Sequence, residues 1–116
     1  MSLHSRKLGL KAKLFRGFGD PTRLFILELL REGEKTASQI VIETRQSQSN
    51  ISNHLACLLE CGLVTNRRQG KNIIYNLSDN RVSKLLEETD VILTEIANGI
   101  YACVNYNEES EGVSKK

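Results

Sequence analysis

Residues 47–62 decide the fold, and they read Ser47-Gln48-Ser49-Asn50-Ile51-Ser52-Asn53-His54-Leu55-Ala56-Cys57-Leu58-Leu59-Glu60-Cys61-Gly62. The first half is polar, uncharged and dense in small hydrogen-bonding side chains, whereas the second half is an apolar run that carries two cysteines. At about 100° per residue, the apolar side chains of a helix here share one face. Ser49, Asn50 and Asn53 are expected on roughly the opposite face. The sequence therefore predicts a helix with one buried side and one polar side, capped by Gly62.

Three further helices are predicted before this stretch. Residues 6–18 alternate apolar and basic side chains at helical spacing. A second helix starts at Asp20-Pro21, where the acid caps and the proline suits the first helical position. A third and shorter helix starts at Thr36, which forms a capping box with Gln39.

The period changes after Gly62. Residues 63–68 and 72–77 read as two strands joined at Gln69-Gly70-Lys71, and Asp79 is expected to cap a last long helix. The predicted class is mainly α with a β-hairpin wing, in the order αααα-ββ-α. We expect one domain over residues 1–103 and a polar, flexible tail over residues 104–116.

A short helix, a tight turn and a second helix form a helix-turn-helix, and the hairpin that follows adds a wing. Readers of the DNA major groove need side chains that both donate and accept hydrogen bonds. The alternative is that these polar residues only form a solvated helix N-terminus, because the same residue types cap helices well. The basic hairpin that follows favours DNA binding over this alternative. The candidate DNA-contacting residues are Ser47, Gln48, Ser49, Asn50, Ser52, Asn53 and His54 in the helix and Arg67, Arg68 and Lys71 in the hairpin.

The composition narrows the class of protein. The chain has 116 residues and a formal net charge of only +2, so affinity for nucleic acid depends on where the charges lie. No run approaches the ~20 apolar residues that span a membrane, and the N-terminus lacks a signal-peptide pattern. Two histidines and no glycine-rich phosphate loop argue against an enzyme. We expect a cytoplasmic protein with no membrane partner and no small-molecule substrate.

The three cysteines suggest a metal site rather than a disulfide framework. Cys57 and Cys61 are four residues apart and share one face of the helix, and Cys103 is the remaining thiol. Three thiolates suit soft ions such as Cd(II) and Pb(II), and Zn(II) is a further candidate with a fourth ligand from His4, His54 or water. The alternative is that all three cysteines are small core residues.

Several motifs together resemble the ArsR/SmtB family of metal-responsive repressors. They are Asp20-Pro21-Thr22-Arg23, residues 49–55, Cys61-Gly62-Leu63-Val64 and residues 70–75. The resemblance implies a winged helix-turn-helix homodimer that represses an operon and leaves operator DNA when metal binds. Cys57, Cys61 and Cys103 match the CmtR type within the family, which senses cadmium and lead. The resemblance does not say whether Cys103 serves its own subunit or the partner.

Two expectations complete this interpretation. The dimer interface is expected from apolar residues of the first and last helices: Leu8, Leu14, Phe15, Leu86, Leu93 and Ile96. The alternative function is a repressor of the same fold that senses oxidants or persulfides through its thiols. In that case Cys103 would be the bridging partner, because two cysteines of one helix are poorly placed for a direct disulfide.

Overall fold

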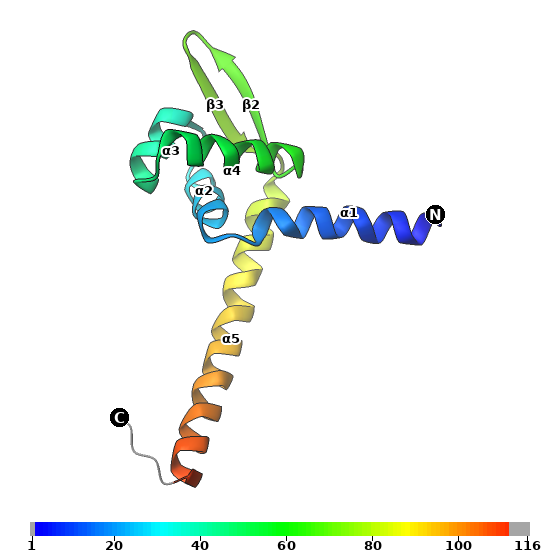
Figure 1. The fold of residues 1–116 in the computed structure, drawn as a ribbon, viewed down its shortest axis with the longest axis vertical. Helices are drawn as coiled ribbons and strands as arrows, with labels where there is room; N and C mark the ends of the chain where they lie inside the picture. Colours follow the sequence, from blue (N-terminus) through cyan, green and yellow to red (C-terminus); the bar gives the residue numbers. More distant parts are fainter. Residues whose placement is uncertain (1, 112–116) are drawn as a thin grey trace. The chain divides into compact units, whose positions relative to one another are not determined.

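The structure is a computed structural model that describes the backbone of residues 2–111 and the side chains of residues 2–99. The chain divides into two compact units, Met1–Ser83 and Lys84–Lys116. The first unit holds the helices α1 to α4 and a small sheet (Figure 1). The second unit holds most of the long helix α5 (Asn80–Glu111).

The helix-turn-helix forms as the capping signals predict. Asp20 accepts hydrogen bonds from the backbone N–H groups of Thr22 (2.9 Å) and Arg23 (3.1 Å), and it starts α2 (Pro21–Arg31). The capping box of Thr36 and Gln39 starts α3 (Ala37–Thr44) with both of its reciprocal bonds.

The recognition helix is α4 (Gln48–Glu60), and Ser47 caps it by accepting a hydrogen bond from the backbone N–H of Asn50 (3.1 Å). At its C-terminus, Gly62 takes a positive φ of 82°, and the N–H of Leu63 bonds to the carbonyl of Leu58 (3.0 Å). Only glycine adopts this backbone conformation without a steric penalty, which explains the position of the predicted cap.

The wing is an antiparallel hairpin of β2 (Val64–Gln69) and β3 (Asn72–Leu77). A strand that the sequence analysis missed, β1 (Lys35–Thr36), pairs with the other edge of β3, so the sheet order is β1-β3-β2. Two residues are too few to show a period, which is why β1 leaves no signal in the sequence. The predicted mainly α winged helix-turn-helix class is confirmed, with this added strand.

The core of the first unit is aliphatic and lies where α2, α3 and α4 meet the sheet. Each of its central side chains is at most 2 % exposed: Ile26, Leu27, Leu30, Ile40, Ile51, Leu55, Leu58 and Leu63. Because α4 contributes three of these residues, its orientation is fixed by burial on one side, and its polar side is left at the surface.

The first and last helices differ from the prediction in length. The first helix, α1 (Leu3–Phe18), starts before residue 6 because the hydroxyl of Ser2 accepts from the N–H of Ser5 (3.1 Å). The last helix, α5, runs to Glu111, so the backbone of residues 104–111 is helical where a loose tail was expected. None of the described helices is both long and apolar enough to cross a bilayer.

Both of these helices carry large apolar side chains that this single chain leaves uncovered. Leu8 and Phe15 on α1 are 51 % and 60 % exposed, and Leu93 and Ile96 on α5 are 58 % and 50 % exposed. These four residues belong to the predicted dimer interface.

Candidate nucleic-acid interface and thiol pair

The surface of α4 that faces away from the core is polar. The exposed polar side chains of its first half, with that of the N-cap residue, are Ser47, Gln48, Ser49, Ser52 and Asn53. Apart from a 3.4 Å contact between the hydroxyls of Ser47 and Ser49, the structure assigns their side chains no hydrogen bond other than the capping bond of Ser47. These groups are thus free to bond base edges, which present both donors and acceptors in the major groove. We call these five residues the reading face.

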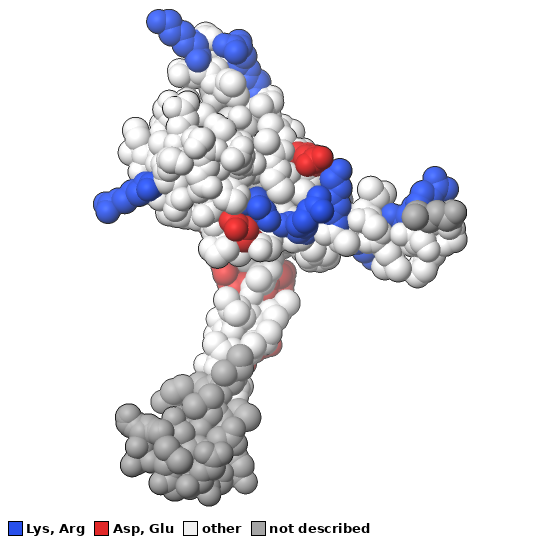
Figure 2. Space-filling model, in the orientation of Figure 1, with Lys and Arg blue, Asp and Glu red and all other residues white. Residues whose placement is uncertain are grey.

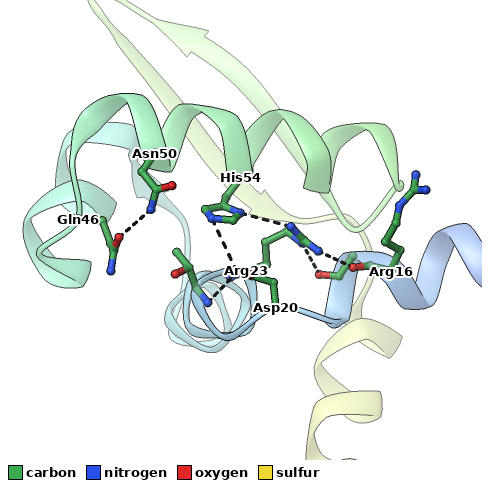
Figure 3. A network of polar contacts seen from close by, with 8 residues as sticks. Arg16, Asp20, Arg23, Gln46, Asn50 and His54 are labelled. Atoms are coloured by element: carbon green, nitrogen blue, oxygen red, sulfur yellow. Dashed lines mark hydrogen bonds and ion pairs between the residues drawn. The ribbon is translucent and has the colours of Figure 1, made fainter.

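Two predicted DNA contacts lie on a different side of α4. Asn50 is half-buried, and its side-chain amide donates to the Oε1 of Gln46 (2.7 Å; Figure 3). His54 is also half-buried, and its imidazole points toward α2 (Figure 3). Asn50 was expected on the face opposite the apolar residues. The structure corrects this, since the side chain of Asn50 is half-buried and bonded to Gln46, the residue just before the N-cap.

His54 is held by two residues of the α2 start. Its Nδ1 lies 3.3 Å from Nη1 of Arg23, and its Nε2 lies 3.7 Å from Oδ2 of Asp20. A guanidinium only donates, so Nδ1 acts as the acceptor, and the ring proton of a neutral imidazole belongs on Nε2, facing the carboxylate. Both ring nitrogens therefore have partners within the protein, which weakens His54 as a metal ligand.

Arg23 also binds the end of α1. Its Nη2 donates to the carbonyl of Arg16 (2.7 Å) and its Nε donates to the carbonyl of Gly17 (3.1 Å). These two carbonyls belong to the last turn of α1, and the carbonyl of Arg16 also accepts from the backbone N–H of Gly19 (3.0 Å). The guanidinium of Arg23 thus joins α1, α2 and α4, and Asp20 contacts His54 of α4 from the start of α2. The sequence did not predict these roles for Asp20 and Arg23.

The three predicted cations of the wing are not equivalent. Arg67 makes a two-pronged ion pair with Glu34 at 2.9 and 3.1 Å, and the guanidinium holds the pKa of the Glu34 carboxyl below its usual value. Arg68 and Lys71 are exposed and have no ion pair among the described residues. Basic side chains gather at the end of the wing in Figure 2. Two of the three cations are therefore free for phosphates.

Cys57 and Cys61 lie together on the same flank of α4 as Asn50 and His54. Cys57 is half-buried and Cys61 is 8 % exposed, and both are free thiols. Burial, followed by the hydrogen bond and charge of Cys57, raises the pKa of the Cys61 thiol, and Arg16 and Lys13 act in the opposite direction. The two thiols therefore lie near one another on one flank of α4.

The end of α1 packs directly on Cys61. A Cβ placed on Gly17 would lie 3.2 Å from Cβ and 3.5 Å from Sγ of Cys61, so only glycine fits without displacement. A hollow of about 400 Å³ opens beside the thiol, and three lysines of α1 contribute to its lining: Lys7, Lys11 and Lys13.

The third predicted ligand lies in α5, but the side chain of Cys103 is outside the described residues. His4 is exposed in the first turn of α1. Within the part of the chain that the structure describes, no three of His, Cys, Asp and Glu form a metal-binding group. The described residues thus supply two thiols.

Residues 20–66 match the family model described as "Bacterial regulatory protein, arsR family". A probable mercury resistance operon repressor of Streptomyces lividans is 36% identical over 86% of this chain and 80% of its own length. The HTH-type transcriptional regulator CmtR of Mycobacterium tuberculosis is 39% identical over 66% of this chain and 65% of its own length.

The fold agrees with these relatives. The homodimeric winged helix-turn-helix DNA-binding domain of Mb0332 from Mycobacterium bovis superposes with a TM-score of 0.79 at 26% identity, covering 85% of this chain and 92% of that domain. These proteins are DNA-binding regulators rather than enzymes, in agreement with the sequence prediction.

Proposed function

This chain belongs to the ArsR family of bacterial regulatory proteins, and on that premise we propose that it is a metal-sensing transcriptional repressor. It binds operator DNA in the cytoplasm as a homodimer, and it leaves the DNA when a thiophilic ion binds to cysteine thiolates. The observation that carries this proposal is that α4 holds both the reading face and the paired thiols of Cys57 and Cys61.

The DNA half of the proposal follows from the reading face and the wing. A dimer places two α4 helices in successive major grooves about 34–36 Å apart, over an imperfect palindrome. Exposed apolar side chains on α1 and α5 supply the surface that a second copy would cover. The reading face specifies the bases, and the free cations of the wing bind phosphates.

The metal half follows from the donor set. Two thiols of one helix flank fit a soft ion, and Cys103 is the third thiol that would complete a three-sulfur site, from the same subunit or from the partner. Cd(II) and Pb(II) suit such a site best, and Zn(II) would need a fourth ligand. Because the Cys61 thiol has a raised pKa, metal binding must displace its proton.

One rigid element then couples the two activities. Metal that draws Cys57 and Cys61 toward a third thiol pulls on the flank of α4, next to Gly17 of α1 and one turn from His54. A tenfold loss of operator affinity requires about 1.4 kcal/mol, which lies within the ~1–3 kcal/mol of typical allosteric couplings. By reciprocity, the DNA-bound dimer binds metal more weakly by the same factor.

Cd(II) titration of the reduced protein tests the metal site through sulfur-to-metal absorbance. Cys61→Ser and Cys103→Ser should each weaken the absorbance, whereas His4→Gln should leave it intact. The DNA site is tested with duplexes that the metal-free protein selects from a random pool. Asn53→Ala should lose these duplexes and keep Cd(II) binding. The sensor function would be overturned if Cys61→Ser left the absorbance unchanged, or if operator affinity were the same with and without Cd(II).

The thiol-oxidation alternative is less well supported. A redox-sensing cysteine needs an exposed thiol with a depressed pKa, because the thiolate is the nucleophile. Cys61 is buried and its pKa is raised. Mass spectrometry of the anaerobic protein after peroxide or a sulfide donor separates the two functions, since a disulfide or polysulfide bridge to Cys103 would support the alternative.

A further inference from the structure

The helix-turn-helix is poor in positive charge. Residues 37–60, which hold α3, the turn and α4, contain one arginine, no lysine and two glutamates. DNA binding draws much of its affinity from cations that neutralise phosphates. The one cation of this segment, Arg45, therefore carries the whole positive contribution that the helix-turn-helix itself can make.

Arg45 has an unusual backbone. It ends α3 with φ 58° and ψ 29°, and it is the only non-glycine residue with a positive φ in the described part of the chain. Glycine or asparagine is the usual residue at such a helix end, because a Cβ is strained there. The capping bond that Arg45 makes, from its N–H to the carbonyl of Val41 (3.0 Å), uses no side-chain atom. The turn itself therefore gains nothing from an arginine.

The guanidinium of Arg45 also has no bonding partner among the described residues. The side chain is exposed, and no hydrogen bond or ion pair to it exists among the described residues. The acid nearest in sequence, Glu43, instead lies 3.3 Å from the ammonium group of Lys35. The charge of Arg45 is thus available in full to a partner outside the chain.

Hydrogen bonds of the turn hold the backbone of Arg45 beside the reading face. The hydroxyl of Thr44, a buried residue, donates to the carbonyl of Ile40 (2.8 Å) and accepts from the N–H of Gln46 at 3.4 Å. Ser47, the N-cap of α4, follows immediately. Arg45 lies two residues before this N-cap, and a cation close to the positive end of a helix dipole favours the binding of an anion.

We propose that Arg45 binds a backbone phosphate of the DNA next to the major groove that α4 reads. The proposal rests on the DNA-binding half of the proposed function. It adds one phosphate contact per subunit, hence two per dimer, to those of the wing. The strained backbone conformation is tolerated because the side chain serves the DNA rather than the turn.

The test separates the charge from the backbone. Arg45→Gly removes the cation and relieves the strain of the positive φ. Arg45→Lys keeps the positive charge and keeps the strained backbone. Lys11→Gln on α1 is a control that loses the same charge as Arg45→Gly. Binding to a fluorescent duplex of mixed sequence, about 30 base pairs long, is measured by anisotropy at several salt concentrations. Phosphate contacts do not depend on sequence, so this probe suffices.

Arg45→Gly should reduce the slope of log K against log[salt] by ~0.9 per subunit, which is ~1.8 per dimer. Wild type should then lose roughly tenfold more affinity than Arg45→Gly between about 50 and 200 mM salt. The Tm of Arg45→Gly should equal or exceed that of wild type, while Arg45→Lys and Lys11→Gln keep the wild-type slope.

Three results would overturn the proposal. The wild-type slope in Arg45→Gly would show that Arg45 makes no phosphate contact, while DNA binding itself stands. An equal loss in Lys11→Gln would show a general effect of net charge. A wild-type protein without salt-dependent affinity would remove the DNA-binding function together with this contact.

Discussion

Replacing Gly17 by alanine tests the contact between α1 and the thiol flank of α4. The added methyl group would lie 2.6 Å from Cδ1 of Leu63 and 3.2 Å from Cβ of Cys61. Leu63 is 1 % exposed and Cys61 is 8 % exposed, so neither can move away into solvent. Overpacking of this kind costs about 1–3 kcal/mol. The better helix propensity of alanine returns up to about 1 kcal/mol.

Gly9→Ala is the matched control. Gly9 lies in the same helix, and a Cβ there would meet no atom within 4 Å. It should therefore show the propensity gain alone, a stabilisation of up to about 1 kcal/mol. The difference between the two variants isolates the clash at Gly17, which we expect to be about 1–3 kcal/mol, with Gly17→Ala itself about 1 kcal/mol less stable than wild type.

Urea unfolding followed by circular dichroism measures both variants. The protomer concentration must be equal in all samples, since dimerisation raises apparent stability by mass action. A difference of 1 kcal/mol corresponds to roughly 4–8 °C in Tm for a domain near this size, so thermal scans give a second estimate. If Gly17→Ala proves as stable as Gly9→Ala, α1 does not pack on Cys61 and Leu63, and the described end of the thiol site is wrong.

Three further predictions concern the network, the wing and the thiols. Arg23→Met removes the hydrogen bonds to α1 and His54 and should cost about 2 kcal/mol in urea unfolding; an unchanged midpoint would show that water replaces them. Glu34→Gln should free Arg67 and tighten binding to duplex DNA in anisotropy titrations, unlike Glu28→Gln. Because the pKa of Cys61 is raised, Cd(II) affinity should increase with pH between about pH 6 and 8 as thiol protons are displaced; pH-independent affinity would contradict thiolate binding.

The raised pKa of the Cys61 thiol also predicts how folding stability depends on pH. The raised pKa in the folded state means that the unfolded chain loses the Cys61 proton first as pH rises. The contribution of this thiol to stability is therefore full below the unfolded pKa near 9, and it falls as pH rises through the folded value. Urea unfolding of wild type and Cys61→Ser on both sides of that pH measures the difference.

The parts of the fold that depend on local chemistry were predictable from the sequence. Asp20, Thr36 and Ser47 each cap the helix that follows through a bond to a residue two or three positions away, and Gly62 ends α4 through its own backbone. Such signals need no tertiary context. The hairpin was equally predictable, because its two strand patterns and its glycine turn lie within a few residues of one another.

The parts that depend on distant partners were not predictable. Arg67 was assigned to DNA, yet it is paired with Glu34, which lies 33 residues away. His54 was predicted as a DNA contact and a possible metal ligand, whereas its imidazole lies against Asp20 and Arg23. The positive φ of Arg45 had no signal, because arginine is not a residue that marks this conformation. The ligand role of Cys103 stays a prediction.

The sparse charge of the helix-turn-helix and wing bears on how this protein searches a chromosome. With Arg67 paired, only Arg45, Arg68 and Lys71 remain unpaired there among the described residues, about six cations in a dimer. Nonspecific affinity from about six phosphate contacts falls by roughly 10³ between 50 and 200 mM salt. At the higher salt concentration the dimer would therefore hold unrelated DNA weakly, and a dimer that metal releases, as proposed, would leave the region of its operator more readily.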